Sequence, residues 1–536
     1  MFPGIPKNHA GVAESKPQWQ FRQLGLEILA MQVLLCLGFL LKSNMGINEA
    51  GKLAIAKQSV NPTWVPNDWY LNQPIGYQAL FAMIFGRLVE ILGFLATSIV
   101  GRFFCYALIA SALVYLGRKL GLQFPLLLLA VLLFLLRQST VAGEWIVGGL
   151  ETKVLSYGFI LWAIHQMLQG SYRWMAVLLG IATSFHVLVG GMATLTALDW
   201  ILLHWKHHRP DWREIVSSMF LYLIGGAFAI HAVVEQFTMP TATVGPLSAS
   251  YIYVFLRNPH HLNPLTWGRW WIPFGIYLLI LGFSFSLVRR KHTIDHRLEP
   301  YASQKGLFEF TLISLIPFVF GVVAAPLDHQ GRFLQYYPFR LADVLLPLST
   351  CLLAACAIQQ FVSQKAQRSF LLVCLVLVSA AYLRQAKTFV GGLKALRQFP
   401  GVQQEVNPDW NDICRWLKAN TPRDATIVST PWYPNSVSWF AERSTIASFK
   451  LVPNTSEAIL EWYQRLQDLS GDQEPLAQGG FEAGERLAKG YGNLTTPQAS
   501  ALMAKYRARY FLTLSDHHLE LPIVYRNQTY MVYRAT

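Results

Sequence analysis

Charged residues are scarce in this chain. Only 14% of its 536 residues are Asp, Glu, Lys or Arg, whereas 53% are hydrophobic. A soluble protein carries about 25% charged residues. The mean hydropathy of +0.32 agrees with this bias. The composition therefore excludes a wholly water-soluble protein and indicates that much of the surface lies in lipid.

Cysteine is also rare, and its spacing excludes two classes of protein. The six cysteines form no Cys-x-x-Cys pair, and five of them lie within apolar runs. This pattern provides neither a disulfide framework nor a structural metal motif, so we expect packing roles. The first apolar run is long and no small-residue cleavage site follows it, which predicts a retained membrane segment rather than a cleaved signal.

The net charge of +14 does not indicate a nucleic-acid-binding protein. Such proteins present a clustered basic face with interleaved aromatic side chains, and no such cluster is evident in the sequence. Lys and Arg instead recur between apolar runs. No internal repeat is evident either.

The apolar runs predict a mainly α-helical, polytopic transmembrane bundle. A spanning helix needs roughly 20 residues, and shorter runs need their flanks to complete a crossing. We expect about eleven spans, at 24–41, 94–116, 124–136, 154–168, 174–189, 192–205, 215–237, 270–288, 307–325, 341–361 and 370–382. Within these runs Glu27, Arg102, His186 and Asp199 should face the bundle interior, because ionisable groups are costly in lipid.

The positions of Lys and Arg predict the orientation. If the N-terminus is cytoplasmic, alternate loops collect basic residues, as the positive-inside rule requires. Residues 81–91, with Arg87 and Glu90 on one helix face, must then lie on the outer surface instead of crossing. The C-terminal end is then extracytoplasmic.

The chain divides into two parts by composition. Residues 1–385 form the membrane part, with outer loops at 42–93, 137–153, 238–269 and 326–340, and residues 386–400 form a connecting helix. Residues 401–536 should form a small soluble α/β domain. In it we expect helices near 413, 456–468 and 498–506, strands at 425–430 and 510–514, and a hairpin at 523–533.

The first outer loop carries two candidate catalytic carboxylates, Glu49 and Asp68. A carboxylate just outside the bilayer is placed to accept a proton from an incoming hydroxyl as general base. The structural alternative for Asp68 is the cap of a helix that begins at Trp69, which is ordinary turn chemistry after a proline.

The second outer loop supplies Glu144, Glu151 and Lys153 at a helix entrance. Glu151 and Lys153 are two positions apart and cannot face each other on a helix, so a local ion pair does not explain them. The structural alternative is that acidic residues near the start of the next helix favour its dipole.

The third and fourth outer loops are basic. Arg257, His260 and His261 cluster between prolines, where adjacent histidines can bind phosphate, donate a proton or ligate a metal, although their spacing matches no recognised metal site. The fourth loop carries Arg332 and Arg340, and Arg is suited to bidentate capture of phosphate. The alternatives are an interfacial anchor for the third loop and contact of Arg340 with lipid headgroups.

Taken together, these loops resemble the GT-C superfamily of polytopic glycosyltransferases. The resemblance rests on the acidic first outer loop INEAGKLAIAKQSVNPTWVPNDWYL, on GGLETK in the second, and on FLRNPHHLNP, SFHVLVGG and TPRDATIVSTP. Asn48-Glu49 stands where that superfamily usually has a pair of acidic residues. The resemblance implies a GT-C-like membrane bundle with an extracytoplasmic C-terminal domain.

The resemblance also implies transfer of a sugar from a polyprenyl-phosphate-linked donor, with Glu49 first and Asp68 second as catalytic base. Phosphate and substrate contacts fall to Glu151, Lys153, Arg257, His260, His261, Arg332 and Arg340. The expected partners are membrane lipids, and we expect no nucleic acid to bind. Whether a divalent metal is needed stays open, and so does the oligomeric state. A transporter and a non-catalytic membrane scaffold with a binding domain are the alternatives; a transporter would use charges such as Arg102 and usually shows a repeat.

Overall fold

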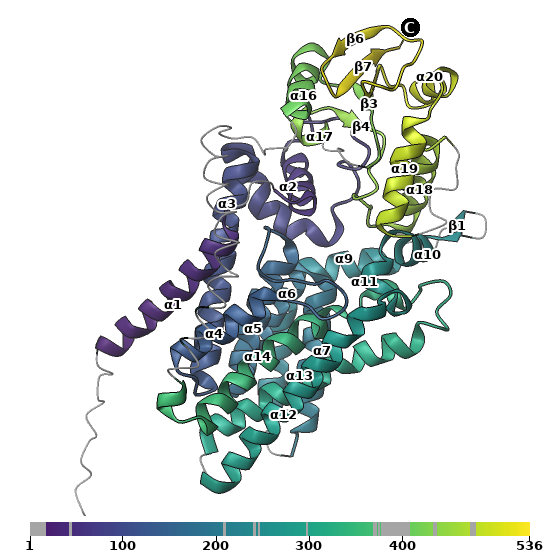
Figure 1. Ribbon diagram of the computed structural model, residues 1–536. Helices are drawn as coiled ribbons and strands as arrows, with labels where there is room; N and C mark the ends of the chain where they lie inside the picture. Colours follow the sequence, from purple (N-terminus) through teal and green to yellow (C-terminus); the bar gives the residue numbers. More distant parts are fainter. Residues whose placement is uncertain are drawn as a thin grey trace, which may run out of the picture.

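The computed structural model consists of a helical bundle and a C-terminal region with a small sheet. It describes residues 18–41, 45–206, 211–238, 243–244, 247–295, 298–367, 372, 376, 408–432, 437–471 and 479–535. In Figure 1 the strands β3 to β7 lie together beyond one end of the helical bundle.

The long helices lie where the apolar runs predict them. They are α1 (Gln18–Phe39), α3 (Ala79–Lys119), α4 (Phe124–Leu136), α5 (Thr152–Leu168), α6 (Tyr172–Phe185), α7 (Val187–Leu203), α8 (Trp212–Gly225), α9 (Ala227–Thr238), α12 (Trp271–Asp295), α13 (Leu298–Ala324) and α14 (Arg340–Phe361). Among the described residues, five helices are long and apolar enough to cross a membrane, or six if the pair α8–α9, bent by 73°, forms one span. The chain is a multi-pass membrane protein.

Some of these helices are shorter than the hydrocarbon layer that a membrane span must cross. Helices α4 and α6 have 13 and 14 residues. At 1.5 Å per residue each is about 20 Å long, shorter than the roughly 30 Å hydrocarbon layer. The predicted last run, 370–382, and the predicted connecting helix, 386–400, lie outside the described residues. The count of about eleven spans therefore stays a prediction.

Helix α3 contains a break at the position where the sequence predicts a change from surface helix to span. Its backbone is non-helical at Gly93, with φ 78° and ψ 174°. That combination is accessible almost only to glycine. The break separates residues 79–92 from 94–119, and Asn61 donates a hydrogen bond to Glu90 of the first part at 2.9 Å.

The ionisable residues inside the predicted spans have different fates. Arg102 and His186 are buried, as predicted, and the half-buried Glu27 pairs with Arg118 at 2.8 Å. The prediction for Asp199 is wrong, because this residue is exposed on α7. It lies in the last part of that helix, near the end of the apolar stretch, where a charge can remain solvated.

Short elements between the long helices form the outer layer. They are α2 (Ile47–Val60), η1 (Gly76–Gln78), β1 (Thr243–Val244), β2 (Leu247–Ser248), α10 (Ala249–Tyr251), η2 (Ile252–Arg257), α11 (Pro259–Leu262), η3 (Pro264–Thr266), η4 (Gly268–Trp270) and η5 (Leu334–Tyr336). The segment η2 is a π-helix. Such segments are rare and frequently occur at functional sites.

The C-terminal region is a small α/β unit whose mixed sheet has the strand order β4-β3-β5-β7-β6. Its strands are β3 (Thr426–Val428), β4 (Ser444–Thr445), β5 (Tyr510–Leu514), β6 (Ile523–Arg526) and β7 (Tyr530–Arg534). Its helices are α16 (Pro408–Asn420), α17 (Val437–Phe440), α18 (Ser456–Leu469), α19 (Phe481–Gly492) and α20 (Thr496–Lys505). β3 runs parallel to β4 and β5, and β7 runs antiparallel to β5 and β6. The predicted strand at 510–514 and the hairpin are confirmed.

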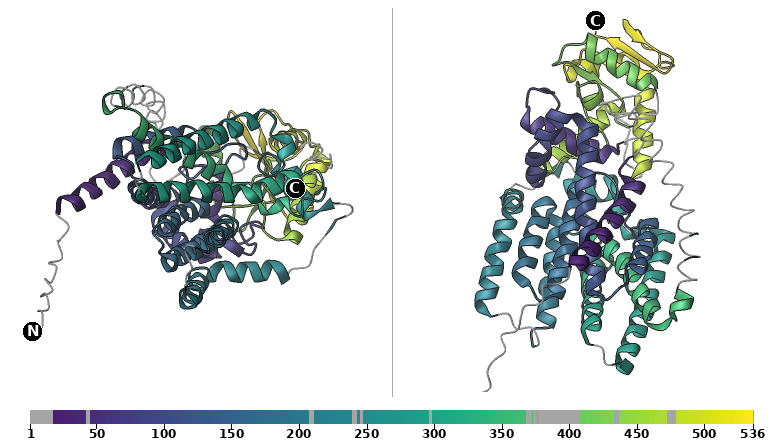
Figure 2. Two further views of the ribbon diagram at one scale, coloured as in Figure 1. Left: turned by 90° about the horizontal axis from the view of Figure 1, so that it is seen from below. Right: turned by 90° about the vertical axis from the view of Figure 1, so that its left-hand side faces the viewer.

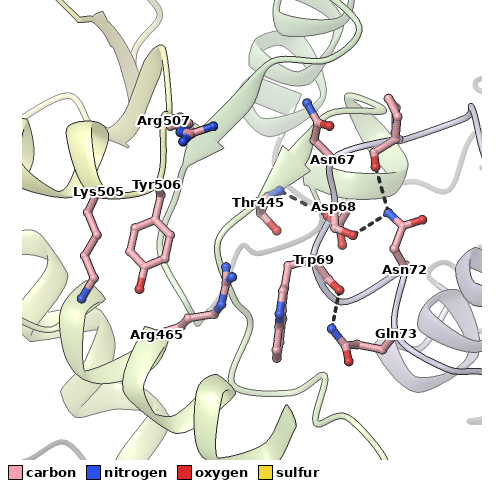
Figure 3. Close-up of a pocket in the computed structure, with 11 residues that line it drawn as sticks. Asn67, Asp68, Trp69, Asn72, Gln73, Thr445, Arg465, Lys505, Tyr506 and Arg507 are labelled. Atoms are coloured by element: carbon pink, nitrogen blue, oxygen red, sulfur yellow. Dashed lines mark hydrogen bonds between the residues drawn. The ribbon is translucent and has the colours of Figure 1, made fainter. Parts of the chain in front are cut away.

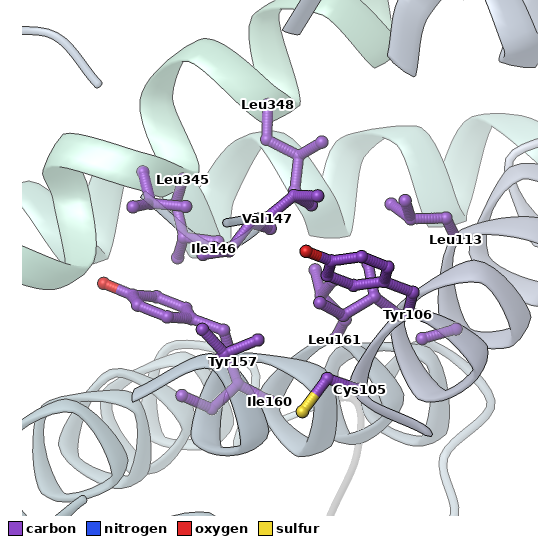
Figure 4. Close-up of a cluster of buried hydrophobic side chains, with 14 of the residues drawn as sticks. Cys105, Tyr106, Leu113, Ile146, Val147, Tyr157, Ile160, Leu161, Leu345 and Leu348 are labelled. Atoms are coloured by element: carbon purple, nitrogen blue, oxygen red, sulfur yellow. The ribbon is translucent and has the colours of Figure 1, made fainter. Parts of the chain in front are cut away.

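Figure 4 shows part of a cluster of buried hydrophobic side chains. It brings together side chains of α3, the second outer loop, α5 and α14. Two tyrosines in it fix loop backbone: Tyr106 donates to Phe39 O at 3.2 Å and also to Gly148 O, and Tyr157 donates to Arg340 O at 2.9 Å. Because buried polar groups must be paired, these bonds hold the second loop and the start of α14 in place.

The C-terminal region rests on the outer layer (Figures 1 and 2). Polar contacts at several places tie the two regions together. Asn67 donates to Asp424 O at 2.8 Å, the Gly480 amide donates to Leu256 O at 2.8 Å, and Arg257 donates to Lys450 O at 3.1 Å.

Candidate functional site

Ionisable residues of different outer loops meet in two buried ion-pair systems. The segment 144–153 of the second outer loop joins them: its Leu150 amide contacts one carboxylate, and its Glu144 is the other. Both systems lie where the helical bundle meets the outer layer.

The first system is the pair of Glu49 and Arg102. Glu49 lies in the first turn of α2 and is 1% exposed. Its carboxylate accepts hydrogen bonds from Ser98 Oγ at 2.6 Å, from the Leu150 amide at 2.7 Å, and from Arg102 through Nε at 3.0 Å and through Nη2. Gly149 makes room for it, since a Cβ there would lie 2.8 Å from Glu49 Oε2. One negative and one positive charge thus balance in this system.

The second system surrounds Glu144. Lys153 Nζ lies 2.9 Å from its Oε1, and Arg340 Nε lies 2.7 Å from its Oε2. Lys153 Nζ also approaches Glu151 at 3.8 Å. Burial opposes ionisation of Glu144, but the charges of Arg340 and Lys153 outweigh it and lower the pKa of this carboxyl to about 2. Glu144 is therefore a carboxylate at neutral pH.

Arg340 extends the second system toward aromatic and imidazole groups. Its Nη1 lies 2.9 Å from His186 Nε2. Because a guanidinium only donates, this nitrogen accepts. The guanidinium also lies 3.8 Å from the centre of the Tyr337 ring, and Tyr337 stands at φ 54°, in the left-handed region. Such backbone strain in a non-glycine residue clusters at functional sites.

Asp343, one turn into α14, holds the second loop above the cluster. Its Oδ1 accepts from the Thr140 hydroxyl at 2.6 Å and from the Thr140 and Val141 amides at 2.8 and 2.7 Å. Its Oδ2 accepts from the Glu144 amide at 3.1 Å. This buried carboxylate positions Glu144, so it acts on the site through the loop backbone.

The third outer loop packs next to this cluster. His261 Nδ1 bonds with Ala142 O of the second loop, and the rings of His260 and His261 lie 4.0 Å apart. Burial lowers the pKa of His261 to about 4, and burial together with His261 and Arg257 lowers the pKa of His260 to about 2. Both imidazoles are neutral at pH 7, so they offer hydrogen bonds rather than positive charge.

Arg257 and Lys450 form a basic contact between the third loop and the C-terminal region. The guanidinium of Arg257 lies 5.1 Å from the centre of the Phe449 ring and donates to Asn258 Oδ1 at 3.1 Å. Burial, followed by the charge of Arg257, lowers the pKa of Lys450 to about 8.

The structure therefore brings Glu151, Lys153 and Arg340 together around Glu144, with His260, His261 and Arg257 beside them. Two predicted residues lie elsewhere. Arg332 is exposed, and its side chain makes no ion pair within the described part of the chain. Asp68 is buried and accepts from the Leu71 amide at 2.9 Å, from Ser438 Oγ at 2.7 Å and from the Thr445 amide at 3.2 Å.

Several residues of this arrangement were not predicted as site residues. Glu144 was visible as a loop carboxylate, but its partner Arg340 lies far away in the chain. Asp343 falls within the apolar run 341–361 and its partners lie in the second outer loop. His186 has a signal in the sequence, because it is a polar interruption in the apolar stretch that becomes α6 and α7. Lys52, which donates to Tyr77 at 3.5 Å, has none. The ring of Tyr77 lies 5.9 Å from that of His186.

Within the described residues, no group of three or more His, Cys, Asp and Glu side chains is arranged to hold a metal ion.

Comparison with known proteins gives one family model and several solved structures. Residues 408–469 match the model described as "Domain of unknown function (DUF6798)". No curated protein matches. ArnT from Cupriavidus metallidurans in the apo state is similar, with 12% identity and a TM-score of 0.50, over 96% of this chain and 98% of that one. The archaeal oligosaccharyltransferase AglB from Archaeoglobus fulgidus, in complex with an inhibitory peptide and a dolichol-phosphate, is similar with 11% identity and a TM-score of 0.50, over 93% and 70%.

These two structures define the class of fold. The chain has a GT-C-like fold, which is that of polytopic membrane glycosyltransferases, and the resemblance seen in the sequence is confirmed at this level. At 11–12% identity the likeness establishes the fold alone.

Proposed function

We propose that the chain is a membrane glycosyltransferase that moves a sugar from a polyprenyl-phosphate-linked donor to an acceptor on the outer face of the bacterial inner membrane. The observation that carries this proposal is the predominance of positive charge around Glu144, where Lys153, Arg340, Arg257 and Lys450 lie around two buried carboxylates, Glu144 and Glu151. In a GT-C-like fold, that excess of cations at the end of an apolar bundle suits a lipid-linked phosphate. The similar AglB structure holds a dolichol-phosphate.

In this proposal Arg340 and Lys153 hold the donor phosphate. The bond between the sugar anomeric carbon and the phosphate oxygen breaks as an acceptor oxygen attacks, and the leaving phosphate takes the electron pair. Fixed cations stabilise that developing charge, and stabilisation of this kind usually lowers the barrier more than any other effect in an active site. Arg257, His260 and His261 lie beside this cluster and contribute further donors. Arg332 is left outside it because its side chain is exposed.

Glu49 is the first candidate for the base that takes the proton of the acceptor hydroxyl. Its carboxylate is bonded to the amide of Leu150, in the same segment that carries Lys153, and is paired with Arg102. To act, its carboxylate must exchange one of its hydrogen bonds for the acceptor. Asp68 is the second candidate, with all its described contacts made to loop and C-terminal residues.

The same pair argues against the transporter alternative. Arg102 is the buried charge that a transported ion or substrate would use, yet Glu49 neutralises it within hydrogen-bond distance. The positive charge that is not balanced lies at the outer layer instead.

The test compares Glu49→Gln with Arg102→Gln in the purified full chain, reconstituted with a panel of polyprenyl-phosphate sugars and cell-envelope lipid extract. Both variants break the same ion pair, and each leaves one buried charge without its partner. If Glu49 is the base, Glu49→Gln should lose a further factor of about 10²–10⁴ in release of polyprenyl phosphate. Equal losses would reject Glu49 as base, and Asp68→Asn then tests the second candidate. No release from any donor by the wild type would reject the proposed function.

A further inference from the structure

A pocket of about 430 Å³ lies at the junction of the first outer loop and the C-terminal region. One wall comes from residues 66–73 of the loop, and the other comes from β4, α18 and the end of α20 (Figure 3). Its volume is in the range of small-molecule sites, roughly 300–1,000 Å³. The proposed transfer reaction does not use this pocket.

Aromatic and basic side chains alternate along this pocket. The guanidinium of Arg465 lies 4.5 Å from the centre of the Trp69 ring and 5.1 Å from that of Tyr506. Asn67, Asn72 and Gln73 add amides, and Thr445 adds a hydroxyl. An aromatic face packs against the C–H face of a sugar ring, while amides and guanidinium groups bond its hydroxyls. The lining therefore matches a saccharide.

The charge of the lining is positive. Arg465 is held by Glu461 at 2.7 Å, and Lys505 by Asp468 at 2.6 Å, and neither acid lines the pocket. Arg507 lines the pocket, is exposed and makes no ion pair among the described residues. Asp68, the one carboxylate in the lining, is 2% exposed and bonded to Ser438 and Thr445.

Arg507 is also held in an unusual backbone conformation. Its φ is 50°, in the left-handed region that residues other than glycine rarely adopt. The amide of Arg507 donates to Ala504 O at 3.3 Å, which closes the turn after α20. The turn thus places the Arg507 cation at the pocket. Among the described residues, this cation has no ion-pair partner.

The wall of the pocket is continuous with the cluster around Glu144. The loop that supplies Trp69 runs on to Tyr77, which contacts Lys52 and the ring of His186. His186 in turn meets Arg340. A molecule in the pocket therefore lies on the loop that leads to the proposed phosphate site.

We propose that this pocket binds an acidic sugar unit, with Trp69 and Tyr506 against the ring and Arg507 on its carboxylate. That this sugar belongs to the acceptor rests on the proposed function, whereas the binding itself does not.

The experiment measures binding to the full chain in detergent by calorimetry and by saturation-transfer NMR, without turnover. The probes are cellobiouronic acid, neutral cellobiose and inorganic phosphate. The wild type should bind the acidic disaccharide about tenfold more tightly than cellobiose, as expected for one charge-assisted contact. Arg507→Asn, which tolerates the left-handed backbone, should abolish that difference. Trp69→Leu should weaken both sugars.

The matched control is Arg509→Asn, the same change at an exposed arginine two positions away that does not line the pocket. It should leave both affinities unchanged. Equal binding of the two sugars, affinities insensitive to Arg507→Asn and Trp69→Leu, or binding of phosphate alone would each overturn the proposal. Because no donor is present, an inactive transferase that binds the acidic sugar rejects the proposed function and not this pocket.

Discussion

Glu49 and Glu144 are both buried carboxylates, and each is paired with an arginine. The segment from Glu144 to Leu150 connects them, because the Leu150 amide donates to Glu49. Glu49 faces one cation and is bonded further by Ser98 and Leu150. Glu144 faces two, Lys153 and Arg340, in a cluster where these cations together with Arg257 and Lys450 outnumber the carboxylates of Glu144 and Glu151. A balanced buried pair mainly holds its surroundings together, whereas surplus cations can recruit a second anion. The difference separates a structural contact from one suited to a ligand.

The largest effect should come from breaking the balanced pair. Arg102→Met leaves the Glu49 carboxylate buried without its cation, which should cost about 3–5 kcal/mol of stability. The double variant with Glu49→Gln should recover part of that loss, because neither charge is then stranded. Thermal unfolding of both single variants and the double variant measures the coupling. Additive losses would mean that the two side chains do not form one unit.

The unbalanced cluster should respond in activity more than in stability. Arg340→Met removes one of two cations from the proposed phosphate site and should lower polyprenyl-phosphate release by about 10²–10³-fold. Arg332→Met changes an exposed arginine of the same loop and should have little effect. A comparable loss in both variants would show that general charge, and not the site around Glu144, matters.

Acid should affect the cluster through its imidazoles. The pKa of His261 is about 4 in the folded chain against an ordinary value of 6.5, so the unfolded chain binds more protons between these values. Stability must then fall as the pH drops through 6.5; His261 accounts for about 2 kcal/mol between pH 7 and 5, and His260, with a pKa of about 2, for a similar amount. Glu144, with its pKa of about 2, adds loss only below about pH 4.5. His261→Asn should reduce the slope of the unfolding profile above pH 5 by about half and leave the part due to His260; an unchanged slope would contradict the burial of His261.

A substitution at Asp68 should give the smallest loss of stability. Asp68 belongs to neither of the two ion-pair systems, so it serves as a reference for both. Asp68→Asn weakens its bonds to Ser438 and the Thr445 amide and should cost about 1–3 kcal/mol. Hydrogen exchange should rise at β4, where the C-terminal region meets the first loop. Ser438→Ala removes one of the same bonds and should produce a milder change at the same amides. Exchange that rises elsewhere but not at β4 would argue against this contact.

Much of the helical fold could be predicted from the sequence, because a chain in lipid must satisfy its backbone within helices and bury its charges. Within the described residues the apolar runs became helices, and Arg102 became buried. The exposed Asp199 shows where such a prediction fails. A residue near a helix end can reach water, and the sequence of an apolar run does not tell where its contact with lipid stops. In the C-terminal region, α19 was missed because its burial depends on residues from other elements, including Trp432.

The site was predicted only in part. The sequence of each loop shows which charged residues it contains, but it does not show which residues of other loops they pair with. Glu151, Lys153 and Arg340 were named, and they do meet, around a carboxylate that was seen but not chosen. The first loop shows the same limit. The sequence names Glu49, but only the fold reveals that Ser98, Arg102 and Leu150 occupy its oxygens.

The break in α3 at Gly93 bears on how the chain is inserted into a bilayer during synthesis. The apolar helical stretch 76–119 has 44 residues and, if straight, would be about 66 Å long, twice the hydrocarbon layer. The backbone at position 93 leaves the helix in a conformation that side chains forbid. One missing Cβ therefore sets the point at which this apolar stretch stops being a single continuous helix. An alanine there would favour a continuous helix and shift every later segment relative to the membrane.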